Sequence, residues 1–107
     1  MRTEVLYFDG CPNHEALLPR MREILARTGV SAEIDLRRIA SDEAAQRERF
    51  LGSPSVRING RDIEPEAEQR TDYGLKCRLY RAATGLSGQP EEELLQAALG
   101  SAAGAIA

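Results

Sequence analysis

The stretch Cys11-Pro12-Asn13-His14 brings a thiol and an imidazole within one helical turn of each other. Cys11 is one of two cysteines in the chain, and His14 is its only histidine. The thiolate is the nucleophilic form of cysteine, and a free thiol with a pKa of about 8.5 is mostly protonated at neutral pH. Unpaired N–H groups at a helix N-terminus favour the anion. We therefore expect Cys11 to be a nucleophile if a helix begins there, with His14 as a residue that could tune its pKa.

The segments around Cys11 predict a strand followed by a helix. Residues 5–8, Val-Leu-Tyr-Phe, form an apolar run typical of a strand buried on both faces, and Asp-Gly then ends it. Pro12 suits the first turn of a helix, and the apolar residues of 17–25 recur at helical spacing. Pro19 lies inside this pattern and predicts a bend, although the helix could instead begin at Pro19. The first interpretation places Cys11 at the helix N-cap and His14 at position N3.

The rest of the chain predicts an α/β domain. Ala32, Ile34 and Leu36 alternate with polar residues, as in a strand with one covered face, and Ser41 is a helix-start signal. Two short runs flank Asn-Gly at 59–60, which is a strong hairpin signal. We expect the order β-α-β-α-β-β-α with a four-stranded mixed sheet in a single domain, 1–107. The last helix is expected over 90–99, a frayed tail over 100–107, and one extra short strand near 77–81.

Composition narrows the classes of function. The chain has 107 residues and a formal net charge of -3, and its basic residues alternate with acidic ones. We therefore expect no nucleic-acid partner, and no apolar run is long enough to predict a membrane span. The N-terminus lacks the pattern of a signal peptide, so we expect a cytoplasmic protein whose thiols are kept reduced. In that setting, two cysteines far apart in the chain favour redox, catalytic or metal chemistry over a structural disulfide.

Three features resemble the thioredoxin superfamily: Cys11 at the end of the first strand, Pro19 inside the first helix, and Ser53-Pro54 just before the third strand. The resemblance covers about residues 3 to 99. It implies a thioredoxin-like fold, a cis peptide bond before Pro54, and a substrate groove shaped by Pro12, Ser53 and Pro54. The chain departs from the usual Cys-X-X-Cys pattern, because His14 replaces the second cysteine.

More narrowly, the segments FDGCPN, GSPSVRINGRDI and GLKCRLYR resemble a small bacterial thioredoxin-like group. Some of its members are described as candidate selenoproteins, and some carry labels linking them to alkylmercury lyase. This resemblance implies thiol or selenol chemistry.

The position of Cys77 decides between mechanisms. If Cys77 meets Cys11, the expected function is that of a thiol-disulfide oxidoreductase in which Cys11 attacks and Cys77 resolves. If Cys77 faces the core, Cys11 works alone through mixed disulfides with a small thiol. The expected partner is a protein or low-molecular-weight thiol or disulfide, with no cofactor. Candidate contacts for such a ligand's carboxylates are Arg57, Arg61, Arg78 and Arg81.

Two other classes of function stay open from the sequence. Cys11, Cys77 and His14 could bind a soft metal ion such as Hg(II), Cu(I) or Zn(II), since soft ions prefer thiolates. The chain could also be a redox-inactive thioredoxin-like domain that binds a partner.

Overall fold

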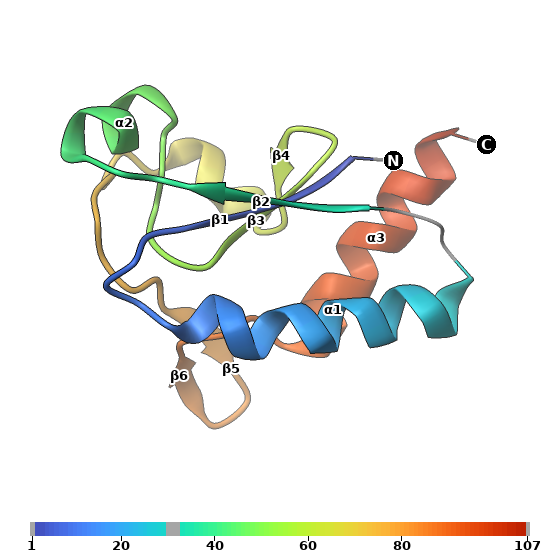
Figure 1. Cartoon of the computed structure of the whole chain (residues 1–107). Helices are drawn as coiled ribbons and strands as arrows, with labels where there is room; N and C mark the ends of the chain where they lie inside the picture. Colours follow the sequence, from blue (N-terminus) through green and yellow to red (C-terminus); the bar gives the residue numbers. More distant parts are fainter. Residues whose placement is uncertain (1, 30–32, 107) are drawn as a thin grey trace.

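The computed structural model describes residues 2–29 and 33–106, and within these ranges the chain forms three α-helices, one 3₁₀ helix and six strands. The α-helices and the strands of the main sheet follow the predicted order β-α-β-α-β-β-α, with an additional 3₁₀ helix and an additional hairpin before the last helix (Figure 1). The elements are β1 (Thr3–Tyr7), α1 (Asn13–Thr28), β2 (Ile34–Arg38), α2 (Asp42–Arg47), β3 (Ser55–Ile58), β4 (Arg61–Asp62), η1 (Pro65–Gln69), β5 (Tyr80–Ala82), β6 (Gly85–Ser87) and α3 (Glu92–Ile106).

The main sheet is mixed and, within the described residues, four-stranded, in the order β2-β1-β3-β4. β1 pairs parallel to β2 and antiparallel to β3, and β3 pairs antiparallel to β4. β1 is therefore an inner strand, as expected of the strand that leads to Cys11. Both residues of the Asn59-Gly60 turn have positive φ, 53° and 83°, which is typical of the tight turn that joins two hairpin strands.

Both faces of the sheet are covered. On one face, Val5 and Val56 pack with buried apolar residues of α1 and α3, such as Met21 and Leu95. On the other face, Leu6 packs with a smaller cluster that includes Ala45 of α2 and Phe50. Val5 and Leu6, neighbours in β1, thus belong to different clusters, as a doubly covered strand requires.

The helices agree with the prediction in part. α1 runs through Pro19 as one helix and ends at Gly29, which takes the left-handed cap conformation. Ser41 caps α2 and accepts a hydrogen bond from the N–H of Ala44. The N-cap of α1 is Pro12 and not Cys11, so the predicted start is one residue too early. α3 continues to Ile106, through the segment that we expected to be a frayed tail.

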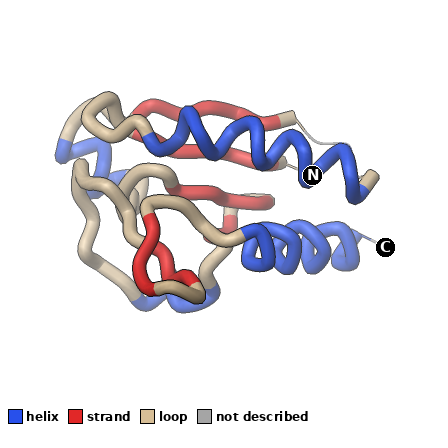
Figure 2. Tube along the Cα trace, turned by 90° about the horizontal axis from the view of Figure 1, so that it is seen from below, coloured by secondary structure: helices blue, strands red, loops and turns tan. Residues whose placement is uncertain are grey.

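The second and the extra strand also differ from the prediction. Leu36 is 48% exposed, because β2 is an edge strand and its predicted inward face is only partly covered. Ala32, expected on the same face, lies outside the described residues. The extra strand begins at Tyr80, later than expected, and pairs with β6 in a separate hairpin next to the start of α3 (Figure 2). Cys77 is outside this hairpin.

The fold places Cys11 at the end of the sheet where β1 meets α1 (Figure 1). The described residues contain no helix with the length and apolar character needed to cross a bilayer.

Candidate functional site

Cys11 is fully buried in the turn between β1 and α1. Its relative exposure is 0%, and its backbone N–H donates to the carbonyl of Phe8 at 3.2 Å. Cys11 closes this turn through its backbone N–H, and the helix begins after it, with Pro12 as the N-cap. Cys11 therefore precedes the first turn of α1.

Ser53 and Pro54 lie against this thiol. The peptide bond between them is cis, the conformation that the resemblance implies. The thiol of Cys11 donates to the backbone carbonyl of Ser53, with 3.5 Å between sulfur and oxygen. The loop before β3 and the turn after β1 thus form one wall of the candidate site.

The segment 76–78 forms hydrogen bonds with both main-chain polar groups of Ser53. The N–H of Ser53 donates to the carbonyl of Lys76 at 2.8 Å, and the N–H of Arg78 donates to the carbonyl of Ser53 at 2.9 Å. The result is a parallel bridge between Ser53 and Cys77. Both main-chain polar groups of Ser53 are therefore hydrogen-bonded within the chain.

Gly52 makes this close approach possible. A Cβ atom at position 52 would lie 3.0 Å from the Cβ and N of Arg78 and from the carbonyl oxygen of Lys76. The φ angle of Gly52 is +120°, a conformation that residues with a side chain rarely adopt. A residue with a side chain here would push the 76–78 segment away.

Docking of this segment brings the two cysteines together. The thiol of Cys77 donates to the sulfur of Cys11, and the two sulfur atoms are 2.6 Å apart. Cys77 is exposed, whereas Cys11 is buried. The hydrogen bond to Cys11 is the largest cause that raises the pKa of Cys77, and partial burial adds to it. The arrangement therefore favours a protonated Cys77 facing the sulfur of Cys11.

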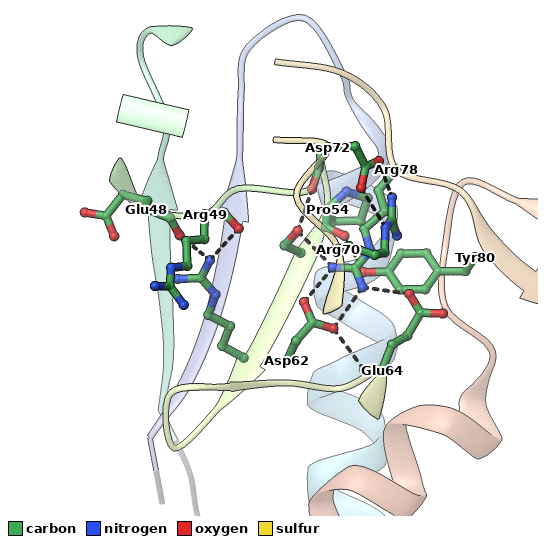
Figure 3. A network of polar contacts seen from close by, with 12 residues as sticks. Glu48, Arg49, Pro54, Asp62, Glu64, Arg70, Asp72, Arg78 and Tyr80 are labelled. Carbon is green, nitrogen blue, oxygen red and sulfur yellow. Dashed lines mark hydrogen bonds and ion pairs between the residues drawn. The ribbon is translucent and has the colours of Figure 1, made fainter. Parts of the chain in front are cut away.

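Arg78 anchors the segment through a buried ionic network (Figure 3). Its guanidinium donates to both carboxylate oxygens of Asp62, at 2.7 and 2.8 Å, and to Glu64 at 2.7 Å. Burial by itself would lower the pKa of Arg78, but the hydrogen bonds and charges of its partners outweigh it and raise the pKa above its usual range. Removing one member of a buried ion pair costs about 3–5 kcal/mol. The residue next to Cys77 is therefore firmly fixed.

Tyr80 connects the same network to the cis-proline loop (Figure 3). Its buried hydroxyl donates to the carbonyl of Pro54 at 2.6 Å, and the guanidinium of Arg78 lies 4.6 Å from its ring centre. Burial raises the pKa of Tyr80, so the hydroxyl stays protonated and acts as a donor. Arg78 and Tyr80 thus hold both sides of the Ser53–Cys77 bridge.

An exposed carboxylate also ties the loop that leads to Cys77. Asp72 accepts hydrogen bonds from Arg70 and Lys76, and these bonds lower its pKa. Asp72 thereby links Arg70 and Lys76, which lie on either side of it in the segment before Cys77. These ion pairs lie at the surface and contribute little to stability.

His14 is placed differently from the expectation. Its ring stacks on Tyr7, with 4.1 Å between ring centres, and Nδ1 lies 3.2 Å from the backbone carbonyl oxygen of Cys11. The imidazole thus contacts the backbone of Cys11. Within the described residues, no group of three or more His, Cys, Asp or Glu side chains is arranged to hold a metal ion. The three-ligand set of Cys11, Cys77 and His14 is therefore not assembled.

The other predicted contacts differ in exposure and in their bonds within the chain. Pro12 is exposed at the start of α1. Arg78 is not free to bind a ligand's carboxylate, because its charge is used internally. Arg57 donates to the backbone carbonyls of Glu48 and Arg49, whereas Arg61 and Arg81 are exposed.

Sequence reasoning missed the residues that position Cys77, which are Gly52, Asp62, Glu64 and Tyr80. One signal was available: Arg78 and Tyr80 alternate with the exposed Cys77 and Leu79, as in a strand with one buried face. The acidic partners of Arg78 could not be predicted from the sequence, because Asp62 and Glu64 lie at and just after β4, far from Arg78 in the chain.

A comparison with models of protein families, with curated proteins and with solved structures found no match to this chain. The site must therefore be interpreted from its own geometry.

Proposed function

We propose that the protein carries out thiol-disulfide exchange, with Cys11 and Cys77 as its dithiol-disulfide pair. The observation that carries the proposal is the 2.6 Å separation of the two sulfur atoms. A disulfide bond is about 2.05 Å long, so the two sulfur atoms lie close to bonding distance. Oxidation forms this bond and releases two protons and two electrons to an external disulfide. Reduction by two external thiols reverses it.

The same proposal includes the fold family of the domain. We propose a thioredoxin-like domain in which residues 76–78 supply the second cysteine that Cys-X-X-Cys proteins carry in their first helix. Support comes from the strand order of the main sheet, Pro19 within α1, and the cis bond before Pro54 beside the thiol of Cys11. A reducing, cytoplasmic location fits a pair that must be recycled by small thiols.

The test is a redox titration of the purified protein. Reduced wild-type protein is equilibrated with mixtures of reduced and oxidised glutathione, quenched with acid, alkylated and measured by intact mass. We expect one transition from the dithiol to the intramolecular Cys11–Cys77 disulfide, followed by peptide mapping of that bond. In a turnover assay on a small disulfide, the double variant Cys11→Ser, Cys77→Ser should show no activity above the uncatalysed rate.

Two outcomes would contradict the proposal. A dithiol that persists even in excess oxidised glutathione would favour a redox-inactive binding domain. Stoichiometric retention of Hg(II) or Zn(II), with both thiols protected from alkylation and no disulfide formed, would favour a soft-metal carrier. Cys77→Ser is the matched control, because it keeps Cys11 but cannot form the intramolecular bond.

A further inference from the structure

We infer that external thiols and disulfides exchange at Cys77, and that Cys11 is the internal partner that closes or opens the disulfide. This inference rests on the proposed function and assigns the order of its steps. It exchanges the roles that the resemblance implied, in which Cys11 attacks and Cys77 resolves.

The first support is the exposure of the two thiols. Cys11 is 0% exposed, enclosed by the β1–α1 turn, the Ser53 carbonyl and Cys77 itself. Cys77 is exposed on the outer side of the same pair. Thiol-disulfide exchange depends on access to the attacked sulfur as well as on thiolate character. An external sulfur atom therefore meets Cys77 first.

The second support is the occupied backbone of Ser53. The N–H and carbonyl of Ser53 are main-chain groups beside the Cys11 thiol with which an extended peptide would pair. Lys76 and Arg78 hold both groups, and the Asp62–Arg78 ion pair anchors this arrangement. The approach to Cys11 beside Ser53 is thus filled by the chain itself. The ligand class that fits is a low-molecular-weight thiol or disulfide, which needs no backbone pairing.

The steps balance in both directions. In reduction, an external thiolate attacks the sulfur of Cys77 in the intramolecular disulfide, the bond to Cys11 breaks, and Cys11 leaves as a thiolate. A second external thiolate then attacks the external sulfur of the mixed disulfide and releases the Cys77 thiolate and an external disulfide. In oxidation, Cys77 attacks the external disulfide and expels one thiolate. Cys11 then attacks the sulfur of Cys77 and expels the second thiolate.

The protons of the oxidation balance as well. Cys77 gives up its proton to solvent before it attacks, and Cys11 gives up its proton before its own attack. The two thiolates expelled from the external disulfide take up two protons in turn.

Trapping of the mixed disulfide tests the inference. Cys11→Ser and Cys77→Ser proteins are mixed with oxidised glutathione under native conditions, and adduct formation is followed by intact mass. We expect the Cys11→Ser protein to accumulate glutathione on Cys77 at least tenfold faster than the Cys77→Ser protein does on Cys11. In urea, where both sites are unfolded, the two rates should come within about threefold.

The wild-type protein supplies a test without loss of either thiol. Its reduced form is reacted briefly with oxidised glutathione, acid-quenched, and the transient adduct is mapped. An adduct on Cys77 supports the assignment, whereas an adduct mainly on Cys11 overturns it. Formation of the intramolecular disulfide in this experiment shows that the proposed function holds even if the order of attack is the opposite one. A dithiol that never oxidises shows that the proposed function has failed.

Discussion

At the scale of single residues, the two thiols are coupled although they belong to distant parts of the chain. The pKa of Cys77 is raised above its ordinary value, chiefly by the hydrogen bond to Cys11. We predict that Cys11→Ala lowers the pKa of Cys77 toward the ordinary value of about 8.5, because the alanine cannot accept this hydrogen bond. The pH dependence of the alkylation rate of Cys77 measures the change. At a pH just below 8.5, Cys77 should therefore react faster in the variant than in the wild-type protein.

A control separates this effect from a general loosening of the site. Tyr80→Phe removes the hydrogen bond to the Pro54 carbonyl but leaves both thiols in place. It is expected to reduce stability by about 1–3 kcal/mol, since a buried carbonyl loses a partner. If Tyr80→Phe lowers the pKa of Cys77 as much as Cys11→Ala does, the pKa shift does not come from the contact between the two sulfur atoms.

At the scale of elements, the site depends on the contact between the loop before β3 and the 76–78 segment. We predict that Gly52→Ala weakens this contact, because the new Cβ would lie 3.0 Å from three atoms of the segment and the φ of +120° is strained for alanine. The expected cost is about 1–3 kcal/mol of unfolding free energy. The fraction of Cys11–Cys77 disulfide at a fixed glutathione ratio should fall as well. Urea unfolding and the redox titration measure these effects.

Gly74→Ala is the matched control for Gly52→Ala. It lies in the segment that leads to Cys77, between η1 and β5, and a Cβ there would have no neighbour within 4 Å. We expect it to leave the disulfide fraction unchanged. Equal losses in both variants would mean that the close approach at Gly52 does not position Cys77.

At the scale of the whole molecule, the proposed disulfide would close a long loop. Cys11 and Cys77 are 66 positions apart, so the bond would join the first strand–helix turn to a segment beyond the main sheet. A loop of this length predicts stabilisation of about 4 kcal/mol through the reduced entropy of the unfolded chain. We therefore predict that the oxidised protein unfolds at a higher urea concentration than the reduced protein.

This comparison requires the same protein in both redox states and Cys77→Ser as a control. The variant should unfold at the same urea concentration with or without reductant. An oxidised wild-type protein that is no more stable than the reduced one would indicate strain in the bonded state that cancels the entropy gain.

Features set by neighbours in the chain could be predicted from the sequence. Most of the apolar run of residues 5–8 lies in the inner strand β1, which spans Thr3–Tyr7, Ser41 is a helix cap, and Asn59-Gly60 forms the hairpin turn. Each of these depends on backbone preferences and on burial patterns within a few residues. The start of α1 was wrong by one residue, because the turn that buries Cys11 delays the helix.

The sequence was enough to predict the order of the α-helices and main-sheet strands, and to place Cys11 after the first strand. Three features depend on tertiary contacts: Cys77 meets Cys11, Cys11 is buried while Cys77 is exposed, and Arg78 is held by Asp62 and Glu64. These are contacts between residues far apart in the chain. They depend on how the 76–78 segment docks against Ser53 and Gly52, which no local preference specifies.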